Sequence, residues 1–166
     1  MPEGEELATQ LLNLFAMPGV RAHLPFAPAT LGLTAAQAAG APGPRFNSIW
    51  AITNHVMFWQ DTLLRLLQGR PADWRELGAT DPNGWVPAGD PADDAAWVAA
   101  RNRALAVNAQ LAEHVSGLDT AALDAPLEAW GQSVRRSVLG IFAHNSYHIA
   151  EIITVRHMQS WWLPET

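Results

Sequence analysis

Four stretches of the sequence place apolar residues at helical spacing, and proline, glycine or capping residues bound each of them. They cover residues 3–17, 47–68, 90–117 and 133–160. Apolar residues at i, i+3, i+4 and i+7 give a helix one apolar face, which it must bury against other elements. Four such helices predict an all-α fold, and we expect residues 1–166 to form a single domain, because this length can bury one core.

The segments between these helices are long. Residues 18–46 contain five prolines and cannot form one helix, although Thr34 and Gln37 have the spacing of a capping box for one short turn. Residues 81–84, Asp-Pro-Asn-Gly, predict a tight turn. Residues 118–132 predict a turn of helix and a small hairpin around Gly131. Connections of this length often form the rim of a site, so we expect them to surround the mouth of a pocket.

Three histidines are the strongest chemical signal. His144 and His148 are four residues apart on the last helix, and His55 lies on the apolar face of the second. A helix turns about 100° per residue, so residues i and i+4 share a face. Three imidazoles directed into one pocket predict a metal site with an open coordination position. The alternatives are hydrogen-bonded core histidines in a metal-free bundle, or haem ligation by His55 and one partner.

Other polar and aromatic residues share these faces. Tyr147 and Glu151 lie near the histidine pair and are the candidate catalytic residues. Arg101 and Asn108 interrupt the apolar stripe of the third helix, and a polar pocket with an anionic ligand would satisfy both. Ordinary core hydrogen bonds would satisfy them equally well. Together with Trp59 they are the candidate substrate-binding residues.

Composition excludes several classes of protein. The net charge of −6 argues against a nucleic-acid-binding surface, and the absence of cysteine excludes disulfides and thiolate ligands. No apolar run is long enough for a membrane span, and the acidic first residues lack a basic leader, so we expect a cytoplasmic protein. Asn145 follows the first histidine of the pair where a zinc protease requires glutamate, and no G-x-S-x-G, Walker or G-x-G-x-x-G motif occurs.

Two motifs point to a family. Residues 48–55, Ser-Ile-Trp-Ala-Ile-Thr-Asn-His, open the second helix, and Phe58 and Trp59 follow. Residues 144–152 read His-Asn-Ser-Tyr-His-Ile-Ala-Glu-Ile. With the order of the helices, these motifs resemble the DinB/YfiT-like superfamily of bacterial four-helix-bundle proteins, whose pattern is H-x-x-x-H-x-G-Q-I. Glu151 stands in place of the family glutamine and adds a carboxylate beside the site.

The resemblance implies an up-down-down-up bundle with long connecting loops, and a homodimer. It also implies a divalent metal, commonly nickel, zinc, iron or manganese, held by His55, His144 and His148. Relatives include thiol-dependent S-transferases, a maleylpyruvate isomerase and hydrolase-like proteins.

Three hypotheses for the function remain. The first is a metal-dependent transferase of a low-molecular-weight thiol, with Arg101 binding a carboxylate of the substrate. The second is a metal-dependent hydrolase with Glu151 as proton acceptor. The third is a non-catalytic stress-response module that holds metal or an apolar ligand.

Overall fold

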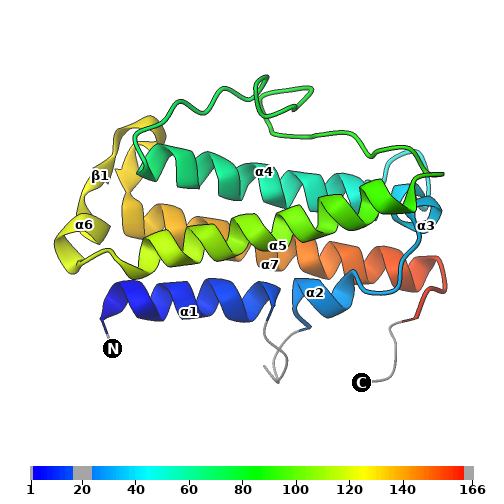
Figure 1. Ribbon diagram of the computed structural model, residues 1–166, viewed down its shortest axis with the longest axis horizontal. Coiled ribbons are helices and arrows are strands. Elements are labelled where there is room, and N and C mark those ends of the chain that lie inside the picture. Colours follow the sequence, from blue (N-terminus) through cyan, green and yellow to red (C-terminus); the bar gives the residue numbers. More distant parts are fainter. Residues whose placement is uncertain (1, 17–23, 163–166) are drawn as a thin grey trace.

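Four long helices form the frame of the protein (Figure 1). The computed structural model describes residues 2–16 and 24–162. The long helices are α1 (Glu3–Phe15), α4 (Ile49–Leu67), α5 (Asp94–Ser116) and α7 (Val134–Met158). The predicted all-α bundle is therefore confirmed. Residues 17–19, where the first helix was predicted to end, lie outside the described residues. In the described ranges, no helix is both long enough and apolar enough to cross a membrane.

The helices run in the order up, down, down, up. Figure 1 shows α1 and α7 running in one direction and α4 and α5 in the other. Residues 68–93 join the parallel helices α4 and α5, and they cross the length of the bundle without a long helix. Near the start of both parallel helices, the rings of Trp50 and Trp97 lie 5.5 Å apart. The helix α4 packs against both α5 and α7, so it brings one face to each of them.

Side-chain caps fix where the long helices begin. The Ser48 hydroxyl accepts a hydrogen bond from the Ala51 backbone at the start of α4, and Ser133 caps α7. The third helix was predicted to begin at residue 90, and this is wrong. Residues 90–93 form a separate turn, because the backbone N–H of Asp93 donates to the Asp90 carbonyl (3.0 Å). Asp93 then caps α5 itself.

Short elements occupy the connections. They are α2 (Phe26–Ala29), α3 (Ala35–Ala39), α6 (Thr120–Asp124), β1 (Pro126–Leu127), the 3-10 helix Glu128–Trp130 and β2 (Gln132–Ser133). The predicted capping box is present, since Thr34 and Gln37 exchange both hydrogen bonds. The predicted hairpin is also present: β1 and β2 pair antiparallel, with Gly131 in the left-handed conformation (φ 61°). Sequence periodicity did not predict α2.

The apolar core has two parts, and the histidines lie where these parts meet. On α4, Val56 belongs to one part of the core and Leu63 to the other. On α7, Ile149 belongs to the first part and Ile141 to the second. His144 and His148 lie between those two isoleucines in the sequence, so the histidines separate the two parts of the core along α7.

Candidate metal centre

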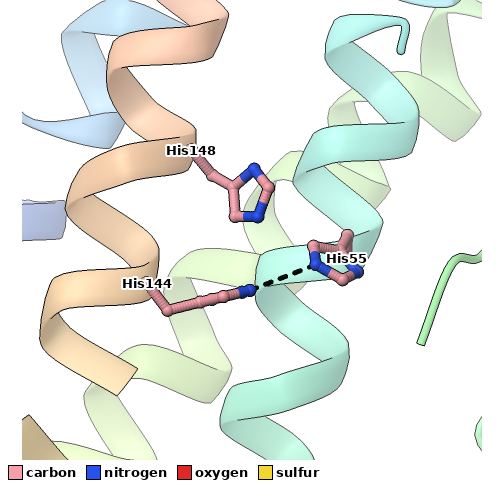
Figure 2. Close-up of side chains that lie close together, drawn as sticks. All are labelled: His55, His144 and His148. Atoms are coloured by element: carbon pink, nitrogen blue, oxygen red, sulfur yellow. Dashed lines mark hydrogen bonds between the residues drawn. The ribbon is translucent and has the colours of Figure 1, made fainter. Parts of the chain in front are cut away.

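The side chains of His55, His144 and His148 point toward one another between α4 and α7 (Figure 2). One ring nitrogen from each residue lies within 4.8 Å of the others. The closest pair is Nε2 of His144 and Nε2 of His55, 3.1 Å apart. The convergence predicted from helical spacing is therefore confirmed.

Each of the three rings has an oxygen partner at Nδ1, on the side away from the cluster. The partners are the Gly84 carbonyl for His55 (3.1 Å), the Asn145 side-chain oxygen for His144 (3.3 Å) and the Glu151 carboxylate for His148 (2.8 Å). A carbonyl or carboxylate oxygen can only accept, so these partners favour the tautomer that carries the proton on Nδ1. In a neutral ring this leaves Nε2 with a lone pair, which is the state that a metal ion requires.

Burial keeps at least two of the rings neutral. His55 is 5% exposed, and burial lowers its pKa to about 4. Burial also lowers the pKa of His144, and the neighbouring His148 adds to that effect. The 3.1 Å contact drawn in Figure 2 is a hydrogen bond only when one of the two Nε2 atoms carries a proton. When both neutral rings carry their proton on Nδ1, two lone pairs face each other at this distance. A cation at this position would remove that repulsion.

The spacing fits a first-row divalent ion. A zinc–imidazole bond is about 2.0–2.1 Å, which places the nitrogens of a tetrahedral site about 3.4 Å apart. The 3.1 Å pair is already close to that separation, and the third nitrogen needs an inward ring movement. Three imidazoles suit zinc, nickel, iron or copper better than calcium or magnesium. The group can thus bind a metal ion and leave a coordination position free.

The crossover between α4 and α5 forms one wall of this centre. The ring of Trp85 stacks on His55, with centroids 4.0 Å apart, and lies nearly perpendicular to the His148 ring (centroids 5.9 Å apart). Sequence reasoning missed Trp85, because a loop residue has no periodicity. The only available signal was its position directly after the predicted turn.

The turn at residues 81–84 holds this wall in place. Gly84 has a left-handed conformation (φ 80°), and a Cβ there would clash with the Phe58 ring. Only glycine therefore lets the Gly84 carbonyl approach α4 closely enough to bind His55. The Trp59 indole N–H donates to the Asn83 carbonyl (3.1 Å), which ties the same turn to α4 a second time.

A pocket of about 410 Å³ opens beside the histidines. Its lining residues come from α4, α7 and the hairpin segment: Trp59, Trp130, Gln132, Ser137, Gly140, Ile141 and His144. Trp59, predicted to bind substrate, therefore lies in a pocket wall that one of the histidines shares.

The two candidate catalytic residues have different positions. Glu151 accepts from His148 and from the Asn47 side chain (3.4 Å), and the hydrogen bond from His148 lowers the pKa of its carboxyl. Tyr147 is 70% exposed and touches His148 only ring to ring (5.1 Å). Glu151 thus binds the Nδ1 atom of His148 that faces away from the cluster, whereas Tyr147 lies at the surface.

Arg101 and Asn108 have partners within the fold. The Arg101 guanidinium donates to the Thr30 hydroxyl and the Ala27 carbonyl, both at 2.9 Å, so it fastens α2 to α5. The Asn108 amide donates to the Gln60 side chain at 2.8 Å and joins α5 to α4. Neither residue lines the pocket beside His144.

A family model described as the DinB superfamily matches residues 26–152. The matched range begins with α2, ends within α7 and contains all three histidines. No curated protein and no solved structure matches the chain.

Proposed function

The chain belongs to the DinB superfamily, and we propose that it is a divalent-metal-dependent transferase of a low-molecular-weight thiol. In the net reaction, the thiol sulfur bonds to a carbon of the acceptor, and the bond from that carbon to its leaving group breaks. The leaving group takes the electron pair, and the thiol proton passes to solvent. The observation that carries the proposal is the convergence of three imidazoles whose Nδ1 atoms are engaged elsewhere.

The nucleophile must come from a small molecule, because the chain contains no cysteine. A divalent cation on three neutral imidazoles would supply one open position where a thiol can bind and ionise near neutral pH. The chain's own residues hold the rings in the required tautomer. Gly84, Asn145 and Glu151 each accept one Nδ1–H, and Trp85 excludes water from the face of His55.

The position of Glu151 favours transfer over hydrolysis. A general base for a metal-bound water would have to reach the Nε2 side of the cluster. Glu151 instead binds Nδ1 of His148, on the opposite side of that ring. We therefore assign Glu151 as a positioning residue. Arg101 has no part in this proposal, because its guanidinium is already bound to α2.

The pocket beside His144 favours one second candidate, a protein that binds an apolar ligand without transforming it. Two tryptophans and Ile141 in its wall would suit such a ligand equally well. A ligand that survives purification and is never altered by the loaded protein would support this candidate.

One set of assays tests the proposal. The full-length protein is stripped of metal and reloaded with zinc, nickel, iron or manganese. Cysteine, glutathione and coenzyme A are then paired with 1-chloro-2,4-dinitrobenzene or iodoacetamide. We expect turnover that requires both metal and thiol, is lost in His144→Ala and persists in His157→Ala, a change at an exposed residue of the same helix. Metal-dependent ester hydrolysis without thiol would support the hydrolase instead, and no metal-dependent transfer with any pair would contradict the proposal.

A further inference from the structure

We propose that the pocket beside His144 binds a neutral aromatic group of the acceptor, and that Trp59 and Trp130 select for it. The identification of this ligand as the acceptor rests on the proposed function. The binding of a neutral aromatic molecule does not, because it follows from the pocket alone.

Neighbouring groups of the protein already occupy several sides of the three histidines. Trp85 covers a face of His55, and the Gly84 carbonyl occupies its outer nitrogen. Glu151 occupies the outer nitrogen of His148. The pocket has His144 in its wall, so a ligand there is adjacent to the cluster.

The aromatic wall is built by two elements far apart in sequence. Trp59 comes from α4 and Trp130 from the 3-10 turn of the hairpin, and their rings meet edge to face with centroids 6.1 Å apart. The Trp59 ring also lies 6.5 Å from both His55 and His144. Aromatic rings favour such edge-to-face and offset arrangements, so a flat ligand gains more here than an aliphatic one of equal size.

The polar part of the wall favours a neutral ligand with one hydrogen-bond donor. The lining residues include no carboxylate, lysine or arginine. Gln132 donates its amide N–H to the Ser137 hydroxyl (3.1 Å), which in turn donates to the Ser133 carbonyl (3.0 Å). The Gln132 amide oxygen can therefore accept a hydrogen bond from a ligand, whereas no lysine or arginine in this wall would bind an anion.

Gly140 allows the pocket to be filled without disturbing the fold. A Cβ at this position of α7 meets no heavy atom within 4 Å, and the residue lines the pocket. Ser137 and His144 lie on the same face of α7 as Gly140 and line the same pocket, so we expect the side chain of Gly140→Leu to occupy it. Gly140→Ala is the matched control that changes helix propensity with little added volume.

The test is calorimetric titration of the full-length protein with 2-naphthol and with its saturated analogue, decahydro-2-naphthol. Both are measured without thiol, with ZnCl2 and after chelation. We expect 2-naphthol to bind the wild type. Its affinity for Gly140→Leu should be about tenfold lower, and its affinity for Gly140→Ala should be within about threefold of the wild-type value. The saturated analogue should bind about three- to tenfold more weakly than 2-naphthol, and Trp130→Ala should remove that preference.

Equal binding of 2-naphthol by the wild type and Gly140→Leu would overturn the inference, as would equal binding of the two ligands by the wild type. These outcomes are separate from the proposed function. If binding follows the expected pattern but no metal-dependent transfer occurs with any thiol, the pocket is established and the transferase proposal fails. If transfer occurs but Gly140→Leu leaves the KM for 1-chloro-2,4-dinitrobenzene unchanged, this inference alone fails.

Discussion

Trp85 stacks face to face on His55, with ring centroids 4.0 Å apart and ring planes 8° from parallel. The two residues lie on different elements, because Trp85 comes from the crossover between α4 and α5 and His55 from α4 itself. The crossover also supplies the Gly84 carbonyl that holds Nδ1 of His55. This connection is therefore a structural part of the candidate metal centre.

Replacing Trp85 with alanine should weaken zinc binding about tenfold, because His55 loses the ring that fixes its plane and excludes water. Competition with a chromophoric chelator measures the change in zinc affinity. The matched control is Trp74→Ala in the same crossover, since the Trp74 ring contacts the Arg75 guanidinium (4.1 Å). Equal zinc affinity in the Trp85 variant and the wild type would exclude a role for the stack.

His144→Ala should remove most of the bound metal while leaving the helical fold intact. The variant loses one of three ligands, but Ile141 and Ile149 still bury the apolar face of α7. Elemental analysis gives the metal content, and circular dichroism gives the helix content. His157→Ala should retain full metal content. A folded His144→Ala protein with wild-type metal content would show that this histidine is not a ligand.

Glu151→Ala should lower metal affinity about 10- to 100-fold, because Nδ1 of His148 loses its acceptor. Glu151→Gln should lower metal affinity by less, since its amide oxygen can still accept that hydrogen bond. Glu113→Ala, at an exposed position of α5, controls for the loss of one negative charge. Zinc competition measures all three variants, and unchanged affinity in Glu151→Ala would remove this residue from the centre.

The metal-free protein should lose stability as the pH falls from 7.5 to 5. The pKa of His55 is lowered to about 4 from 6.5, so the unfolded chain takes up a proton in this range and the folded protein does not. The free energy of unfolding therefore declines as the pH falls below the pKa that His55 has in the unfolded chain. His55 alone should lower it by about 2 kcal/mol at pH 5. The lowered pKa of His144 acts in the same direction.

Urea unfolding in the presence of a chelator measures this dependence on pH. His55→Gln should flatten it, and His157→Gln should leave it unchanged. The lowered pKa of Glu151 stabilises the fold above its unfolded pKa and loses that effect as the pH falls further, so its contribution lies below the measured range. An equally steep decline in His55→Gln would contradict the buried, neutral state of His55.

Asn108→Ala should destabilise the fold by about 1–3 kcal/mol, because the buried Gln60 side chain loses its hydrogen-bond partner. The KM of any substrate should not change, since Asn108 joins α5 to α4 and does not line the pocket. Urea unfolding and steady-state kinetics separate the two effects. A raised KM with unchanged stability would instead assign Asn108 to substrate binding.

Local signals allowed much of the fold to be predicted. The Ser48 and Ser133 hydroxyls accept hydrogen bonds from backbone N–H groups three residues later in the chain. The Thr34 hydroxyl does the same in its capping box. The start of α5 was predicted wrongly because Asp90 and Asp93 both have the chemistry of a cap. The structure selects Asp93, and the adjacent Asp94 carboxylate accepts from the Ala35 backbone (2.6 Å), which ties the start of α5 to α3.

Helical periodicity is a local property of the backbone, so it was enough to predict that His144 and His148 share a face and that His55 lies on a buried one. The residues that surround these histidines could not be predicted in this way, because they come from distant parts of the chain. His55 contacts Gly84, which is 29 residues away in the sequence, and His144, which is 89 residues away. Arg101 binds Ala27, which is 74 residues away. Periodicity identifies the buried face of a helix but not its partner, which depends on how the helices cross and on the path of the loops between them.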